Sequence, residues 1–134
     1  MDEPVWLEEK SVHAIHQRQL AEHGGLPGVR DPGGLQSALA RPRHLFAYGE
    51  PPPDLAAMAA AYAAGFVWNH PFVDGNKRVA HVAARSFLRA NGWDLQARAE
   101  DKYITVIGLA THQISEEEFA AWIRSHLAPW APRQ

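Results

Sequence analysis

The sequence lacks cysteine entirely among its 134 residues. Disulfide bonds, thiolate metal ligands and a cysteine nucleophile are therefore excluded. The chain also lacks a long apolar run, because its most apolar stretch, residues 56–68, is short and rich in alanine and does not predict a membrane span. Residues 1–4 carry neither the basic region nor the apolar run of an export signal, so we expect a cytoplasmic protein with no membrane partner.

An excess of charge of one sign is absent too. The 13 basic and 15 acidic residues give a formal net charge of −2, and the basic residues are scattered. A broad duplex-binding surface needs clustered lysine and arginine, so no nucleic-acid partner is predicted. With 46% hydrophobic residues and no internal repeat, we expect a single domain over residues 1–134 that buries its core without cross-links.

Apolar residues recur at helical spacing along most of the chain, which predicts an all-α fold of about six helices around a central helix pair. Asp31 and Pro32 have the residue types of a cap and a first helical position, and they predict a short helix. Ser115 and Glu118 have the spacing of a capping box. The other predicted helices cover residues 7–22, 55–69, 76–90 and 100–112, with the last one following Ser115.

Two segments do not fit a helical pattern. Residues 41–54 contain four prolines and Gly49, so they predict an irregular surface loop. Residues 93–97 follow Gly92 and predict a short extended segment. His13 and His16 share one face of the first helix, but without a third ligand nearby in the sequence they favour a structural or solvent-facing role over a metal site.

Nine consecutive residues, His70 to Arg78, carry the densest chemistry of the chain: His-Pro-Phe-Val-Asp-Gly-Asn-Lys-Arg. His70 stands at the end of one predicted helix, where Pro71 disfavours further helical geometry. Phe72 offers an apolar anchor for the turn. Gly75 and Asn76 are the expected first residues of the next helix, whose free amide groups point back into the turn.

This arrangement is typical of a site that handles phosphate. The amide groups, the helix dipole and the cations Lys77 and Arg78 favour an anion. Asp74 is a hard oxygen ligand, and magnesium bound to phosphates takes one or two protein carboxylates. His70 can accept a proton from a hydroxyl near neutral pH. The pattern predicts a base, a metal ligand and a phosphate clamp.

Each of these residues also has an ordinary structural interpretation. His70 can be a capping histidine, Asp74 an N-cap, and Lys77 with Arg78 part of a solvated face. The combination of all of them in one connection favours the phosphate site.

The nine residues resemble the signature of the Fic superfamily, H-P-F-x-x-G-N-G-R-x-x-R, and are closer to its Doc branch of death-on-curing toxins, H-x-F-x-D-A-N-K-R. Lys77 carries that distinction, because most Fic proteins have glycine there. Gly75 replaces the alanine of Doc. His81 stands where the last Fic arginine grips nucleotide phosphates in the members that transfer AMP.

The resemblance extends beyond this signature. Residues 23–35 are similar to the loop that follows the first helix in death-on-curing proteins, and residues 36–42 and 87–92 also fit the family. In Fic folds a flap positions the target segment, and residues 41–54 correspond to that region; a flap and a plain connector are equally expected there. The glycine-rich loop at Arg30 is expected near the substrate groove.

What the resemblance implies is a kinase-like toxin of a toxin–antitoxin system. Such a toxin binds ATP with Mg²⁺ in reversed orientation and moves the terminal phosphate to a threonine or serine hydroxyl of an elongation factor Tu-like protein, which arrests translation. His70 would be the base, Asp74 the magnesium-associated acid and Asn76 a ligand of a phosphate oxygen through its side-chain amide. Lys77 and Arg78 would grip the phosphates.

The same resemblance gives Phe72 the role of a structural anchor, and Gly75 contributes backbone. Many Fic proteins carry a self-inhibitory Ser/Thr-x-x-x-Glu-Gly/Asn pattern, and this sequence has no such match. Inhibition by a Phd-like antitoxin is therefore expected. Two other functions stay open, an AMP or other nucleotide transferase acting on a protein hydroxyl and a catalytically silent nucleotide-binding module.

Overall fold

A computed structural model describes residues 2–131 of the chain. These residues form six α-helices and one two-stranded antiparallel sheet, which confirms the predicted all-α class. None of the helices within them has both the length and the hydrophobicity that crossing a bilayer requires. In chain order the elements are α1 (Glu9–His23), α2 (Pro32–Tyr48), α3 (Leu55–Asn69), α4 (Asn76–Ala90), β1 (Trp93–Leu95), α5 (Ala99–Ala110), α6 (Glu116–Arg124) and β2 (Leu127–Pro129).

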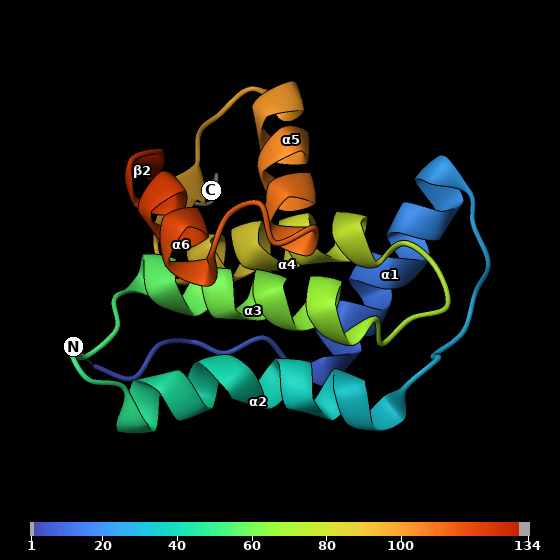
Figure 1. The fold of residues 1–134 in the computed structure, drawn as a ribbon, viewed down its shortest axis with the longest axis horizontal. Helices are drawn as coiled ribbons and strands as arrows, with labels where there is room; N and C mark the ends of the chain where they lie inside the picture. Colours follow the sequence, from blue (N-terminus) through green and yellow to red (C-terminus); the bar gives the residue numbers. More distant parts are fainter. Residues whose placement is uncertain (1, 132–134) are drawn as a thin grey trace.

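Helix α3 is the centre of the molecule. It lies between α2 on one side and α4, α5 and α6 on the other (Figure 1). Ala56 and every residue from 58 to 67 are buried, which explains why this helix is apolar all round and rich in alanine. Small side chains let neighbouring helices approach closely. Gly65 is the extreme case, because a Cβ built there would lie 2.9 Å from both Cα and Cβ of Ala38 in α2.

The predicted loop over residues 41–54 is wrong for its first half, because α2 continues to Tyr48 and is not a short helix. Pro42 lies buried inside it. A proline in a helix interior removes one hydrogen bond. Here, Leu45 and Phe46 pack against the core from the next turn, and this burial outweighs the loss. The irregular connection is confined to residues 49–54. Asp31 caps the start of α2 as predicted, since its carboxylate accepts a hydrogen bond from Gly34 N.

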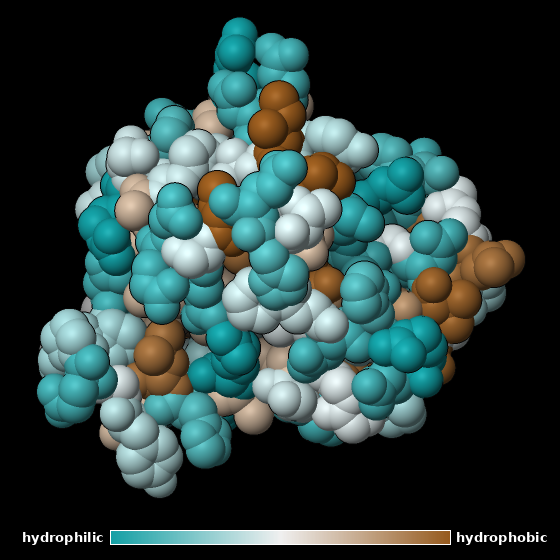
Figure 2. Space-filling view, in the orientation of Figure 1, coloured by the Kyte–Doolittle hydropathy of each residue, from teal (hydrophilic) through white to brown (hydrophobic). Residues whose placement is uncertain are grey.

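The C-terminal part agrees with the predicted pattern and adds one strand. The extended segment occupies Trp93–Leu95 and pairs with Leu127–Pro129, which was not predicted as a strand. Ser115 and Glu118 form the predicted capping box at the start of α6. The surface seen in Figure 2 is mostly hydrophilic, with apolar side chains in small separate groups.

Candidate phosphate-binding turn between helices α3 and α4

His70 ends α3 in the left-handed conformation, with φ 47° and ψ 57°. Its side chain is exposed, while Pro71 and Phe72 beside it are buried. The guanidinium of Arg30 donates to the carbonyl oxygens of Asn69 (2.8 Å) and His70 (2.7 Å), the last residues of the helix. Arg30 therefore neutralises the negative end of α3 and fixes the backbone that carries the imidazole.

Asn76 braces the turn from inside. Its side-chain oxygen accepts from Phe72 N and its side-chain nitrogen donates to Phe72 O, both at 3.0 Å, and its side chain is buried. The carboxamide thus makes the two backbone hydrogen bonds that a neighbouring strand would make to Phe72, and it closes the turn around this residue. The oxygen and one N–H of Asn76 thus bind the protein backbone, so only its second side-chain N–H is left for the phosphate contact that the resemblance implies.

His16, from α1, also belongs to this site, although it was not predicted as a site residue. Its ring stacks on Phe72 with 3.9 Å between centroids, and its Nε2 lies 2.9 Å from the carbonyl oxygen of Asp74. Because that oxygen can only accept, Nε2 must carry the proton. His16 is 4% exposed. Of the structural and solvent-facing roles expected for this histidine, the structure shows the structural one.

The loop before α2 also supports the turn. Val29 and Phe72 form an isolated antiparallel bridge, and Val73 N donates to Gly28 O at 3.0 Å. The backbone amides of Arg30 and Asp31 both donate to Pro71 O. Arg30 therefore lies at the site, as the resemblance implied. The segment that lies along the signature is residues 26–31, whereas residues 41–54 contribute no lining residue to the cavity at His70, so their assignment as the flap is not supported.

Asp74 does not cap α4, because the N-cap is Gly75 with φ 82°. Its carboxylate instead accepts from Gly75 N (2.9 Å) and from Leu26 N (3.2 Å). Gly25 comes so near that an added Cβ would lie 2.9 Å from Asp74 Oδ2. The carboxylate is thus oriented by backbone amides and keeps lone pairs free for a further ligand.

The first turn of α4 presents free donors. Within residues 2–131 no hydrogen bond uses the amides of Asn76, Lys77 and Arg78, and the two cationic side chains form no ion pair. Both cations are exposed. Cations at the positive end of a helix are unfavourable there unless an anion binds.

These groups surround one cavity of about 320 Å³. Its walls are formed by His70, Val73, Asp74, Gly75, Asn76, Lys77, Arg78 and Tyr103. All six predicted polar or backbone site residues are therefore brought together, and Phe72 lies buried beneath them as the anchor. Two further residues line the cavity that were not predicted as site residues, Val73 within the signature and Tyr103 from α5, which lies 25 or more residues away in the sequence.

The cavity fits a magnesium-bound polyphosphate. Residues 2–131 contain no group of three or more carboxylate or histidine side chains that could hold a metal by themselves. A magnesium ion that accompanies phosphates does not need one, because it takes one or two protein carboxylates and keeps the phosphate oxygens and waters as its other ligands. Asp74 would supply that carboxylate, and the free amides with Lys77 and Arg78 would supply donors for phosphate.

Comparison with known proteins agrees with this geometry. Residues 6–88 match the Fic/DOC family. The chain is 37% identical over 118 residues to "Protein kinase doc" of Escherichia phage P1, which covers 88% of this chain and 92% of that protein. It is 45% identical over 83 residues to "Toxin Doc" of Mycolicibacterium smegmatis, which covers 58% of this chain and 64% of that protein. The matched residues include both the signature turn and α1 with its buried histidine, and the chain therefore belongs to the Fic/DOC family.

Proposed function

We propose that this protein is a Doc-like toxin with kinase-type activity, which transfers phosphate from ATP to a threonine or serine hydroxyl of an elongation factor Tu-like translation factor. The observation that carries the proposal is the single cavity in which an exposed imidazole, an oriented carboxylate, free helix amides and two unpaired cations meet. The name of the phage P1 relative, a protein kinase, supports the same reaction class.

In the proposed reaction, His70 accepts the proton of the target hydroxyl as its oxygen bonds to the terminal phosphorus. The bond from that phosphorus to the bridging oxygen breaks, and ADP leaves. Such general-base catalysis contributes on the order of 100- to 10,000-fold. Since Arg30 fixes the backbone of His70 and Pro71 ends the helix, the imidazole is presented at the rim of the cavity.

The remaining acceleration comes from electrostatic stabilisation of the phosphate charge. The amides of the first α4 turn, together with Lys77 and Arg78, bind the phosphate oxygens. Asp74 would hold Mg²⁺, which would supply charge neutralisation for the phosphate groups. Asn76 and Phe72 keep the turn in shape while these charges redistribute. Gly75 permits the close approach of the backbone.

The test is to incubate the purified protein with elongation factor Tu and Mg-ATP and to weigh the intact factor. We expect a gain of about 80 Da, which corresponds to one phosphate. A gain of about 329 Da would instead identify AMP transfer. Unchanged mass with every nucleoside triphosphate would support a silent nucleotide-binding module.

His70→Ala should reduce the rate of transfer by at least about 100-fold, because it removes the base. His44→Ala is the matched control: His44 is an exposed histidine on α2 that does not line this cavity, and its loss should leave the rate unchanged. Growth arrest on expression should disappear with His70→Ala. Persistent arrest at full strength would contradict a catalytic toxin.

The proposed function also implies how the activity of the protein is regulated. A Phd-like antitoxin would inhibit in trans, since the sequence carries no match to the self-inhibitory pattern. Co-expression with such an antitoxin should restore growth to cells that express the wild-type chain.

A further inference from the structure

Tyr103, from α5, carries the one side-chain hydroxyl among the eight residues that line the cavity at His70. The reaction proposed above does not use it. Its side chain is 67% exposed, and an exposed side chain changes rotamer within nanoseconds. The phenolic oxygen of Tyr103 is therefore free to move at the wall of the cavity that holds the base.

The other two tyrosines of the chain are placed differently. Tyr62 is fully buried, and its hydroxyl oxygen accepts a hydrogen bond from Leu7 N at 3.1 Å. Tyr48 is 77% exposed on α2, but it lines a separate hollow and not the cavity at His70. Tyr103 is thus the tyrosine that combines an accessible hydroxyl with a place beside the imidazole.

His70 and Tyr103 share a cavity of about 320 Å³, a size at the lower end of small-molecule sites. A triphosphate that fills such a cavity contacts the walls on both sides, so its terminal phosphate meets a base and a hydroxyl of the same chain. A nucleophile held in the same molecule reacts without a bimolecular encounter. A phenol also loses its proton more readily than an aliphatic hydroxyl does.

The surroundings of Tyr103 also favour a phosphorylated product. A phosphorylated tyrosine carries a charge of about −1.5 to −2 at pH 7. Lys77 and Arg78 line the same cavity, and neither forms an ion pair within residues 2–131. A phosphate placed opposite such cations forms about one to three charge-assisted hydrogen bonds.

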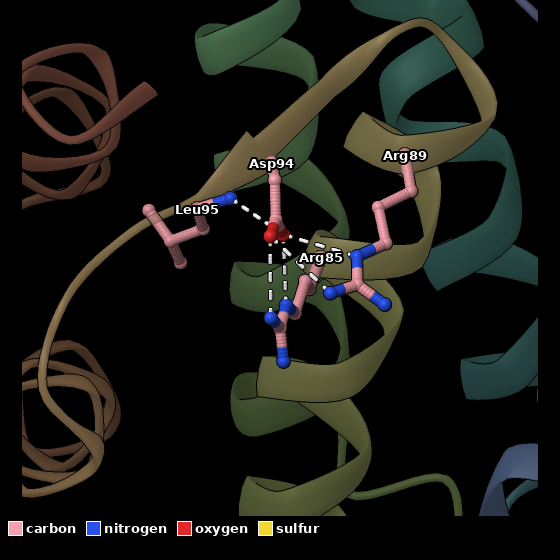
Figure 3. Close-up of polar contacts among 4 residues, drawn as sticks. All are labelled: Arg85, Arg89, Asp94 and Leu95. Carbon is pink, nitrogen blue, oxygen red and sulfur yellow. Dashed lines mark hydrogen bonds and ion pairs between the residues drawn. The ribbon is translucent and has the colours of Figure 1, made fainter. Parts of the chain in front are cut away.

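Arg85 and Arg89, further along α4, do not compete for that phosphate. Figure 3 shows both guanidinium groups on the carboxylate of Asp94, which accepts from Arg85 at 2.8 and 3.3 Å and from Arg89 at 3.0 and 3.2 Å. Of the α4 cations, those left for a phosphate on Tyr103 are therefore Lys77 and Arg78. The phosphates of the nucleotide need the same two cations.

We propose that Tyr103 is an intramolecular phosphate acceptor, through which the protein limits its own activity. The inference rests on the proposed function. The phenolic oxygen of Tyr103 bonds to the terminal phosphorus of ATP, the bond from that phosphorus to the bridging oxygen breaks, and ADP leaves with the bonding electrons. The phenolic proton passes to the imidazole of His70. The phosphate on Tyr103 then pairs with Lys77 and Arg78 and excludes a second nucleotide.

The first test incubates the purified chain alone with Mg-ATP and weighs it. We expect a gain of about 80 Da on the wild type, located at Tyr103 by peptide sequencing, and no gain on Tyr103→Phe or His70→Ala. Tyr103→Phe removes only an exposed hydroxyl, so its thermal unfolding should match that of the wild type.

Tyr48→Phe is the matched control, because Tyr48 is the more exposed tyrosine and lies outside this cavity. It should gain the same mass as the wild type. A wild-type chain that stays unmodified, or a Tyr103→Phe chain that gains the mass, overturns the proposal.

The second test mixes the wild type with His70→Ala, whose own Tyr103 is intact, and resolves the two chains by mass. Intramolecular transfer predicts that only the wild type gains phosphate. Equal phosphorylation of His70→Ala would mean transfer between molecules and would contradict the proposal.

The third test measures the effect on activity. Wild type preincubated with Mg-ATP should modify elongation factor Tu more slowly, in proportion to the phosphorylated fraction, whereas preincubated Tyr103→Phe should keep its initial rate. A phosphorylated chain with an unchanged rate overturns the self-limiting role.

These results also separate the two proposals. Transfer to elongation factor Tu without any gain on the chain itself refutes the intramolecular acceptor alone. A gain on Tyr103 without transfer to the factor supports the acceptor and refutes the proposed target. No gain on either protein refutes both.

Discussion

At the scale of single residues, His16 controls the direction of one peptide group. Its Nε2 holds the Asp74 carbonyl toward α1. In a trans peptide the carbonyl and the following amide point in opposite directions, so the Gly75 N–H is turned away from α1. One buried imidazole therefore keeps the Gly75 amide aimed at the Asp74 carboxylate, to which it donates.

His16→Phe should keep the stack on Phe72 but leave the Asp74 carbonyl without its donor. We expect a loss of about 1–3 kcal/mol in the free energy of unfolding, measured in urea, and a fall in kcat of phosphate transfer. His16→Gln, whose amide can donate to the same oxygen, should restore part of kcat. His13→Phe is the control, because His13 also contacts the Phe72 ring but does not bond to the turn. A kcat for His16→Phe equal to that of the wild type would contradict the positioning role.

At the scale of elements, the crossing of α2 and α3 depends on Gly65. Gly65→Ala places a methyl group 2.9 Å from backbone and side chain of Ala38, so the helices must separate, and we expect a loss of about 1–3 kcal/mol in stability. Gly108→Ala in α5 is the matched comparison, since its new Cβ meets only Ile114, at 3.5 Å. Helix propensity should then raise stability by about 0.5–1 kcal/mol. Thermal unfolding of both variants measures the contrast, and equal effects would show that the crossing is not tightly packed.

Local signals explain which elements could be predicted from the sequence. The start of α4 follows from Gly75 and Asn76, and the start of α6 from Ser115, because caps and turns are decided by neighbours in the chain. Pro42 misled the prediction for α2, since a local preference was overcome by packing of Leu45 and Phe46 three and four residues later. Strand β2 was missed because its partner lies more than thirty residues earlier.

The residues of the site also divide into those that the local sequence predicts and those that only the fold brings together. The contiguous residues from His70 to Arg78 could be predicted to form one cavity. The partners that hold them could not, because His16 reaches Asp74 across 58 positions and Arg30 reaches His70 across 40. Tyr103 joins the cavity at His70 only through the packing of α5 against α4.

At the scale of the whole molecule, Asp94 links stability to pH. It joins α4 to the β1–β2 pair through Arg85 and Arg89. Hydrogen bonds from Arg85, and then from Arg89, hold the pKa of the Asp94 carboxyl well below its usual range in spite of its burial. A depressed folded-state pKa means that the carboxylate stabilises the protein above its unfolded pKa, about 3.9, and that this contribution is lost as pH falls below it.

Asp94→Asn should therefore lower the free energy of unfolding by about 1–3 kcal/mol at pH 7, and the difference from wild type should shrink as pH falls below about 4. Urea titrations at several pH values measure this. Asp101→Asn is the control, because the Asp101 ion pair with Arg98 is exposed and should contribute less than about 1 kcal/mol. A difference for Asp94→Asn that does not vary with pH would mean that its charge is unimportant.

The left-handed backbone conformation of His70 restricts which residues the fold tolerates at this position. The proposed reaction, by contrast, needs an imidazole there. Asparagine adopts that conformation more readily than most residues and cannot replace imidazole as a base. A His70→Asn form should thus accumulate to high yield in living cells while keeping the shape that cognate proteins recognise. It would serve as bait for isolating the natural target and the neutralising partner.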